Sequence, residues 1–367
     1  MAQLTSDIVW LVERDITLAD GSRHTVLAPQ LYLATRTKEQ TAIAPSGAHI
    51  GANAINIDTQ GANLLNQAGT IAARQTLAIR AGQLSHRDGG QKIALQTQGD
   101  INIHGARTEA TDTLIAQAGG NIAISSSTRT SQGGDAANGY SHTVLDRQAQ
   151  LRVGETNPAT PNNNPDPGLL HLAAAGDIRI NAGHITNTAP RGATQLQAGQ
   201  DLHLGTIATA SSSQLRWDAQ NYLRTRQRRE QGSILHSQAD TLLHAGKDIR
   251  LQAADIDAAG AVELRAGRDM ELQAGRQQRE VEQGFHHRSK SLLGGSSNTY
   301  RGSSSADEAQ GSGIGGRTIV AQAGRDLRMR GGSLISDAGS SLQAERDIEL
   351  QAAQNRYMAE SYEQHKS

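Results

Sequence analysis

The sequence predicts an all-β protein, a right-handed parallel β-helix in which short strands stack coil upon coil. Its composition, a recurring phrase and the alternation within that phrase support this fold class. Only 2% of residues are aromatic, while glycine occurs 39 times. Large aromatic side chains normally fill a globular core, because each buries much apolar area. Thin repeated layers of Ala, Leu, Ile and Val therefore fit this composition better.

A short phrase, in which a turn containing Gly and Asp precedes a hydrophobic-x-hydrophobic run, recurs along the chain. Where nothing interrupts it, as from Asp248 to Asp269, the spacing is about 21 residues. A fixed period in this range indicates a solenoid. The turn aspartates, which we expect to cap backbone N–H groups, are Asp100, Asp177, Asp201, Asp248, Asp269, Asp326 and Asp347.

Each phrase reads as a strand with one buried face, because apolar and polar residues alternate in it. About three such strands per 21-residue coil would form the solenoid, and stacking on neighbouring coils would stabilise each one. The residues predicted to point inward are Ile249, Leu251, Met270, Leu272, Leu327 and Met329, and those predicted to point outward are Arg250, Glu271 and Arg328.

Two domains are predicted, residues 1–45 and residues 46–367. In the first, the apolar runs Ile8–Val12 and Thr25–Ala28 flank Asp20-Gly21, a strong hairpin signal. We expect a small antiparallel element attached to the start of the solenoid or capping it. The second domain holds the repeats.

Polar excursions interrupt the repeats at about 126–168, 211–237 and 278–316. In solenoids such insertions lie on one side, often the contacting side. We expect hairpins that the stalk can lose without unfolding. The segment 354–367 resembles the outgoing arm of a fourth excursion, so we expect it to be frayed and the final coil to be uncapped.

The repeated Ala-Gly-Arg-Asp-hydrophobic-x-Leu phrase resembles the haemagglutinin repeats of filamentous haemagglutinin-like exoproteins, over essentially residues 50–367. The opening segments Ser6–Leu11, Asp20–Ser22 and Val26–Tyr32 look like the lead into the second repeat region of contact-dependent growth-inhibition effectors. The resemblance implies secretion through an outer-membrane two-partner transporter, display on a Gram-negative cell surface, and contact with a target cell's outer membrane during toxin delivery. The family's secretion domain and toxin are not in this sequence, and the resemblance carries over no catalytic residue and no cofactor.

Charge and residue counts limit the other functions. The formal net charge is -1, so no overall field favours nucleic acid or an anionic membrane. There is no cysteine, which excludes disulfides, Cys-based zinc sites and thiol nucleophiles. The first seven residues contain no signal peptide, and no apolar stretch is long enough for a transmembrane helix. An export signal would have to lie outside this fragment.

Several residue groups allow a functional and a structural interpretation. The turn aspartates are too sparse for calcium; neighbouring Arg-Asp turns should instead form a solvated surface ladder of weak ion pairs. A glycan-cleaving β-helix enzyme would need convergent carboxylates in one groove. His286 and His287 are adjacent, so on a strand they point to opposite faces and cannot share a metal ion.

One cluster remains a candidate contact site for lipopolysaccharide, a sulfated glycan or another polyanion, or else is simply a charged hairpin face. Its members are Trp217, Tyr222, Arg224, Arg226, Arg228 and Arg229. The leading hypothesis is a non-enzymatic stalk segment that contacts a neighbouring cell in growth inhibition. A host-cell adhesin of the same architecture is the alternative.

Overall fold

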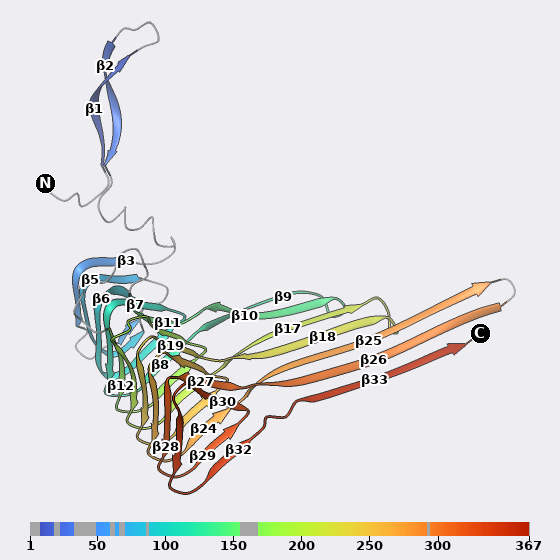
Figure 1. Cartoon of the computed structure of the whole chain (residues 1–367). Coiled ribbons are helices and arrows are strands. Elements are labelled where there is room, and N and C mark those ends of the chain that lie inside the picture. The colour runs from blue at the N-terminus through green and yellow to red at the C-terminus, as the bar shows by residue number, and fades with distance from the viewer. Residues whose placement is uncertain are drawn as a thin grey trace.

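A computed structural model of the chain describes residues 8–17, 23–32, 49–58, 63–65, 70–85, 88–154, 168–291 and 294–366. All regular secondary structure in these ranges is β-strand, and most strands belong to one large system of parallel pairs. Figure 1 shows these strands stacked as successive coils, with a broad sheet projecting from one side. The predicted parallel β-helix is confirmed.

The N-terminal strands form the expected antiparallel pair. β1 (Ile8–Thr17) pairs with β2 (Arg23–Tyr32), with Val12 opposite Ala28. Among the described strands, these two pair only with each other. Residues 18–22, where the turn was predicted, and the connection 33–48 lie outside the described ranges, so a capping role stays a prediction.

From β7 onward each coil contributes one strand to each of three parallel sheets, with β7 (Arg107–Ala118) starting the first and second sheets. The first sheet continues with β11 (Gln150–Val153), β14 (His184–Asn187), β19 (Ile234–Ser237), β22 (Asp255–Ala258), β27 (Ser312–Gly316) and β30 (Gly332–Ser336). The second continues with β12 (Leu169–Ala174), β15 (Ala193–Ala198), β20 (Asp240–Ala245), β23 (Ala261–Ala266), β28 (Thr318–Ala323) and β31 (Ser340–Ala344). The third comprises β8 (Ile122–Ser125), β13 (Ile178–Asn181), β16 (Leu202–Gly205), β21 (Ile249–Gln252), β24 (Met270–Gln273), β29 (Leu327–Arg330) and β32 (Ile348–Gln351).

The first coils use longer strands that continue from one sheet into the next. They are β3 (His49–Asp58), β4 (Asn63–Leu65), β5 (Thr70–Ser85) and β6 (Asp88–His104). β5 pairs in parallel with β3, β4 and β6, and β6 pairs with both β7 and β8. The stack therefore continues without a break into the regular coils.

The core lies inside the stack and follows the predicted alternation. Ile249, Leu251, Met270, Leu272 and Leu327 are buried, while Met329 is partly buried and packs on the same cluster. Arg250 is exposed, and Glu271 and Arg328 occupy the outward positions of their strands. The predicted inward and outward sets are thus confirmed. Ile348 and Leu350, in the last described coil, are exposed.

The excursions do not project as separate hairpins; they join into one antiparallel sheet, which we call the wing. It consists of β9 (Ser127–Gly134), β10 (Gly139–Arg147), β17 (Ile207–Arg216), β18 (Tyr222–Gln231), β25 (Gly275–Ser291), β26 (Gly294–Gln310) and β33 (Arg356–Lys366). The strand order is β33-β26-β25-β18-β17-β10-β9. The three hairpins and β33 leave the solenoid at the same corner, since β9, β17, β25 and β33 each follow a strand of the third sheet (Figure 1).

The wing is continuous because the hairpins are spaced to match the coils. Two coils, β11–β13 and β14–β16, separate the first hairpin from the second. Two coils also separate the second hairpin from the third, and the third from β33. Coils in a β-helix and strands in a sheet are both about 4.8 Å apart. Two coils therefore advance the stack by the width of one hairpin, so neighbouring hairpins meet at pairing distance.

The excursion boundaries differ from those expected. The segment 126–168 contains a hairpin and then β11, which returns to the first sheet. The second hairpin already begins at Ile207, and Ile234–Ser237 belongs to the solenoid. The third spans Gly275–Gln310. Hairpin arms continue regular pairing back to the coil corner, so the change to polar composition marks only part of each arm.

The segment 354–367 also differs from the frayed arm that was expected. β33 pairs antiparallel with β26, from Arg356 opposite Asp307 to Lys366 opposite Ser297. The preceding hairpin supplies the missing partner on one side. Its side chains are nevertheless exposed throughout.

Candidate contact surface

Buried serines hold the corners from which the wing leaves. Ser233, which follows the second hairpin, donates its hydroxyl to the carbonyls of Ile180, at 2.8 Å, and Gly205, at 3.0 Å. Ser312 follows the third hairpin and bonds in the same way to the carbonyl of Gln273, at 2.7 Å. Two of these carbonyls, those of Gly205 and Gln273, also accept a backbone N–H group, so the hydroxyls add a second bond where the chain turns outward. The wing is therefore anchored to the solenoid by buried hydrogen bonds.

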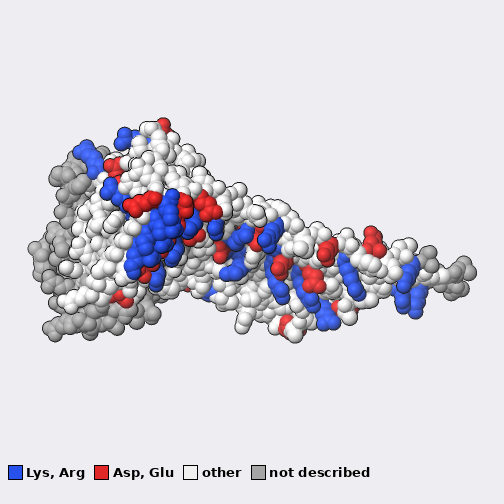
Figure 2. All heavy atoms as spheres, turned by 90° about the horizontal axis from the view of Figure 1, so that it is seen from below, with Lys and Arg blue, Asp and Glu red and all other residues white. Residues whose placement is uncertain are grey.

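The wing is a single layer with two chemically different faces. Cross-strand partners share a face and neighbours along a strand alternate, so the register assigns each side chain to one side. One side, the arginine face, carries Arg216, Tyr222, Arg224, Arg226, Arg228, Arg276, Glu280, Glu282, Arg301, Asp307 and Arg356. The other side, which we call the apolar face, carries Tyr140, Leu215, Leu223, Val281, Phe285 and Tyr300, together with the charged residues Arg229, Arg279 and Glu308. Figure 2 shows Lys and Arg side chains along the wing and a denser group of both charges on the solenoid.

The predicted basic cluster is only partly brought together. Tyr222, Arg224, Arg226 and Arg228 share the arginine face, but Arg229 lies on the apolar face because it follows Arg228 on the same strand. Strand alternation alone would have separated it.

Two of these arginines have carboxylate partners on the neighbouring strand β25. Arg224 Nη1 lies 3.1 Å from Glu282 Oε2, and Arg226 Nη1 lies 3.8 Å from Glu280 Oε2. Sequence reasoning missed these partners because they are more than fifty residues away. Arg228 and Arg301 are exposed, and neither forms an ion pair with a described residue.

Tyr222 is half-buried and has a structural role in the wing. A Cβ added at Gly284, its partner on β25, would lie 2.5 Å from the Tyr222 ring. The ring therefore covers the glycine, and the Arg224 guanidinium lies 5.2 Å from the ring centroid. This stacking fixes Arg224 on the arginine face.

Trp217 lies at the tip of the second hairpin and is 70% exposed. The tip is closed by Asp218, whose carboxylate accepts the backbone N–H groups of Gln220 and Asn221 at 2.7 and 2.8 Å. A hydrogen bond from the Asn221 side chain, together with these two backbone bonds, lowers the pKa of Asp218. Asp135 closes the first hairpin tip in the same way, over Asn138. The shared Asp-x-x-Asn spacing could have located both tips in the sequence.

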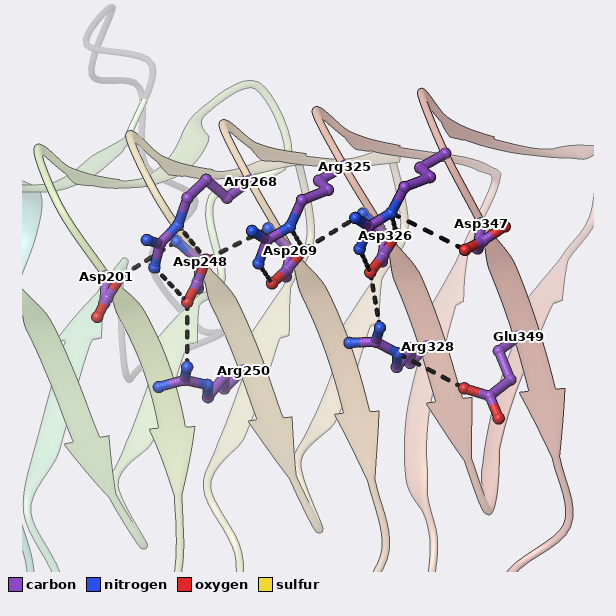
Figure 3. Close-up of polar contacts among 11 residues, drawn as sticks. Asp201, Asp248, Arg250, Arg268, Asp269, Arg325, Asp326, Arg328, Asp347 and Glu349 are labelled. Carbon is purple, nitrogen blue, oxygen red and sulfur yellow. Dashed lines mark hydrogen bonds and ion pairs between the residues drawn. The ribbon is translucent and has the colours of Figure 1, made fainter.

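The turn aspartates form the expected ladder at the corner between the second and third sheets (Figure 3). Arg268 Nε and Nη2 lie 2.9 and 2.8 Å from the two carboxylate oxygens of Asp248, one coil earlier. Arg325 binds Asp269, and Arg346 binds Asp326, in the same bidentate way. The aspartates also accept backbone N–H groups from the next coil, as expected for turn caps. These N–H groups belong to Asn121, Asp201, Asp248, Asp269 and Asp326. The Asp177 N–H donates to the side-chain oxygen of Asn121, which takes the place of an aspartate in that coil.

The ladder is less solvated than the sequence predicted. The side chains of Asp248 and Asp326 are only 3% and 1% exposed, because the next coil covers them. The hydrogen bond from Arg346 is the main reason that the pKa of Asp326 is lowered to about 2. Burial raises the pKa of Asp248, but bonds from Arg268 and the Asp269 N–H outweigh it and leave this pKa lowered. The prediction of a solvated ladder of weak ion pairs was therefore wrong for the carboxylates of Asp248 and Asp326, which are buried.

The remaining candidate residues are two adjacent histidines on the wing. His286 and His287 lie on opposite faces of β25, and no cluster of three or more potential metal ligands was found among the described residues. The described part of the chain also contains no helix that is long and apolar enough to cross a membrane.

Residues 210–292 and 293–367 each match the family model described as hemagglutinin repeat. Residues 210–367, less than half of the chain, are thus similar to hemagglutinin repeats. The boundary between the two matches falls at the tip of the third hairpin, so each match ends with an outgoing wing strand. The first match contains the end of β17, the returning strand β18, two coils and the outgoing strand β25. The second contains the returning strand β26, two coils and the outgoing strand β33. This repeated unit of two coils per hairpin makes the wing continuous.

The matches relate this part of the chain to the hemagglutinin repeat family, a structural and adhesive family of secreted and cell-surface proteins. Comparison with curated proteins and with solved structures found no match.

Proposed function

We propose that this chain is a stalk segment of a secreted bacterial surface filament and that the wing is its contact surface for a neighbouring cell. The observation that carries the proposal is the joining of all excursions into one sheet on one side of the stalk. The solenoid buries its apolar side chains, whereas both faces of the wing are open, and the arginine face and Trp217 lie on it.

The finer proposal is contact-dependent growth inhibition, in which the segment engages the target cell's outer membrane while a toxin is delivered. The resemblance of the opening segments to growth-inhibition effectors supports it. In this proposal the parent protein leaves a Gram-negative cell through an outer-membrane two-partner transporter. A host-cell adhesin of the same architecture is the second candidate, because the hemagglutinin repeats are common to both.

The chemistry of the arginine face supports a phosphorylated or sulfated glycan as its ligand. Guanidinium groups bind such anions in a bidentate manner, and Arg228 and Arg301 are exposed without ion-pair partners among the described residues. An open hollow of about 550 Å³ lies beside Arg224 and Arg226, bordered on the same face by Ser212 and Gln214. A sugar residue of an anionic glycan fits a space of this size.

Binding of the purified chain to cells tests the proposal. We expect binding to Gram-negative bacteria or their outer-membrane vesicles, competed by lipopolysaccharide. The double variant Arg228→Glu/Arg301→Glu should bind at least about tenfold more weakly. The matched control Arg191→Glu/Arg317→Glu reverses two exposed charges on solenoid loops and should bind normally.

Equal losses in both double variants would contradict a role for the wing. Binding to mammalian cells but not to bacteria would favour the adhesin.

A further inference from the structure

The third hairpin extends beyond the second and leaves an open step in the wing. β18 pairs with β25 only from Arg229 opposite Gln277 to Tyr222 opposite Gly284. β25 continues along β26 to Ser291 opposite Gly294. From Phe285 to Ser291, β25 therefore has a strand partner on one side only among the described residues. We call this segment the step; Figure 1 shows β25 and β26 projecting past the tip of β17 and β18.

The backbone of the step presents free hydrogen-bonding groups. The N–H of His286 donates to the Asn221 side chain at 2.7 Å, so it points away from β26. In an antiparallel pair, alternate residues point their N–H and C=O groups to the same side. The N–H and C=O groups of Arg288 and Lys290 therefore point to the open side. An added strand could therefore pair with this open edge of β25, which begins where β18 ends.

The side chains of the step are basic. His286, Arg288 and Lys290 alternate on the arginine face, and no described residue forms an ion pair with Arg288 or Lys290. Phe285 and Trp217, both exposed, lie at the closed end, where the second hairpin ends. Positive charge along the edge and aromatic rings at its end favour an extended acidic segment over a neutral or basic one.

We propose that the step binds an extended, acidic polypeptide segment of a partner protein by β-strand addition. Main-chain hydrogen bonds to Arg288 and Lys290 would hold the strand. Carboxylates two residues apart on the partner would pair with these two side chains on one face of the extended sheet. This site is distinct from the exposed arginines of the inner strands and does not depend on which cell the wing contacts.

A synthetic peptide tests the step directly. The probe alternates Glu and Val over seven residues, and its control replaces each Glu with Lys. By fluorescence anisotropy with the full chain, we expect the acidic peptide to bind at least about tenfold more tightly than the basic one. At saturation, amide hydrogen exchange at Arg288 and Lys290 should slow at least tenfold. No binding, or binding without this protection, would overturn the proposal.

Variants separate strand addition from simple charge attraction. Arg288→Pro removes an outward N–H and spares the bonds to β26, because proline is tolerated at the solvent side of an edge strand. It should abolish binding, while Arg288→Gln, which keeps the N–H, should weaken binding only a few-fold. Arg288→Glu/Lys290→Glu should reverse the preference toward the Lys peptide.

The control Arg228→Glu changes an equally exposed charge on an inner strand, paired on both sides. It should leave acidic-peptide binding unchanged. An equal loss in Arg228→Glu and Arg288→Pro would overturn the proposal, since general attraction to the arginine face would then explain the binding. That outcome would leave the proposed cell contact of the wing intact.

Discussion

The solenoid and the wing are both β-sheets of one chain, yet different forces hold them together. Solenoid strands are short, parallel and covered on one face by a continuous apolar core. Wing strands are longer and antiparallel, form a single layer and bury little. Stacking stabilises the first, whereas cross-strand pairing and the spacing of the exit corners determine the second. The spacing of the coils in the solenoid thus determines which wing strands pair.

Removing one coil should break this relation most severely. Deleting residues 234–254 joins Ser233 to β22 and should leave the remaining coils stacked. One coil advances the stack by the width of one strand, whereas a hairpin is two strands wide. The third hairpin would then leave the solenoid one strand width too close to the second, and β25 could not pair with β18. Amide exchange across 222–229 and 277–284 should accelerate at least about a hundredfold, while β23 and β24 stay protected.

A deletion of residues 233–311 is the matched control, because it removes two coils together with one hairpin. It should bring β33 beside β18 and keep the wing continuous. If the shorter deletion left the wing protected, the spacing argument would be wrong.

A cavity in the core should separate the two regions by stability. Leu272 is buried inside the third sheet, so Leu272→Ala should lower the free energy of unfolding by about 2–5 kcal/mol. Val281→Ala removes a half-buried side chain on the wing's apolar face and should cost less than about 1 kcal/mol. Denaturant titration monitored by circular dichroism measures both, and similar losses would contradict the comparison.

The corner serines should show an intermediate effect. Ser233→Ala removes the hydroxyl that donates to the Ile180 carbonyl and accepts the Gly183 N–H group, and the loss of these buried bonds costs about 1–3 kcal/mol. On the wing, Ser213 bonds to Thr225 in a half-buried position, and Ser213→Ala should cost less. Thermal unfolding of the two variants under one condition makes the test.

Acid should weaken the solenoid gradually. The folded pKa of Asp326 is about 2, below the value of about 3.9 expected for an unfolded chain. A depressed folded pKa stabilises the fold above the unfolded value, and this contribution is lost as the pH falls from about 4 to 2. Asp269, whose pKa the Arg325 hydrogen bond lowers, acts in the same direction. The unfolding temperature of Arg346→Gln should fall less steeply over this range than that of the unchanged chain.

Local pattern predicted the solenoid well, because a coil is made by residues close in sequence. The alternation at Ile249 and Leu251 identified the inward face, and the Gly-Asp turns located the corners. The wing was not predicted, because pairing between Arg224 and Glu282 depends on the number of coils between their hairpins. The burial of Asp326 was missed for a related reason, since it comes from the coil stacked above.

The wing has a mechanical consequence for a stalk that carries it on one corner only. Bending in the plane of the wing would stretch or compress its outer ends and shear the hydrogen bonds between strands. Bending perpendicular to that plane changes the strand spacing far less. A filament built of such units should therefore bend more easily perpendicular to the plane of the wing than within that plane. It would then keep the free edge of the wing facing in one direction.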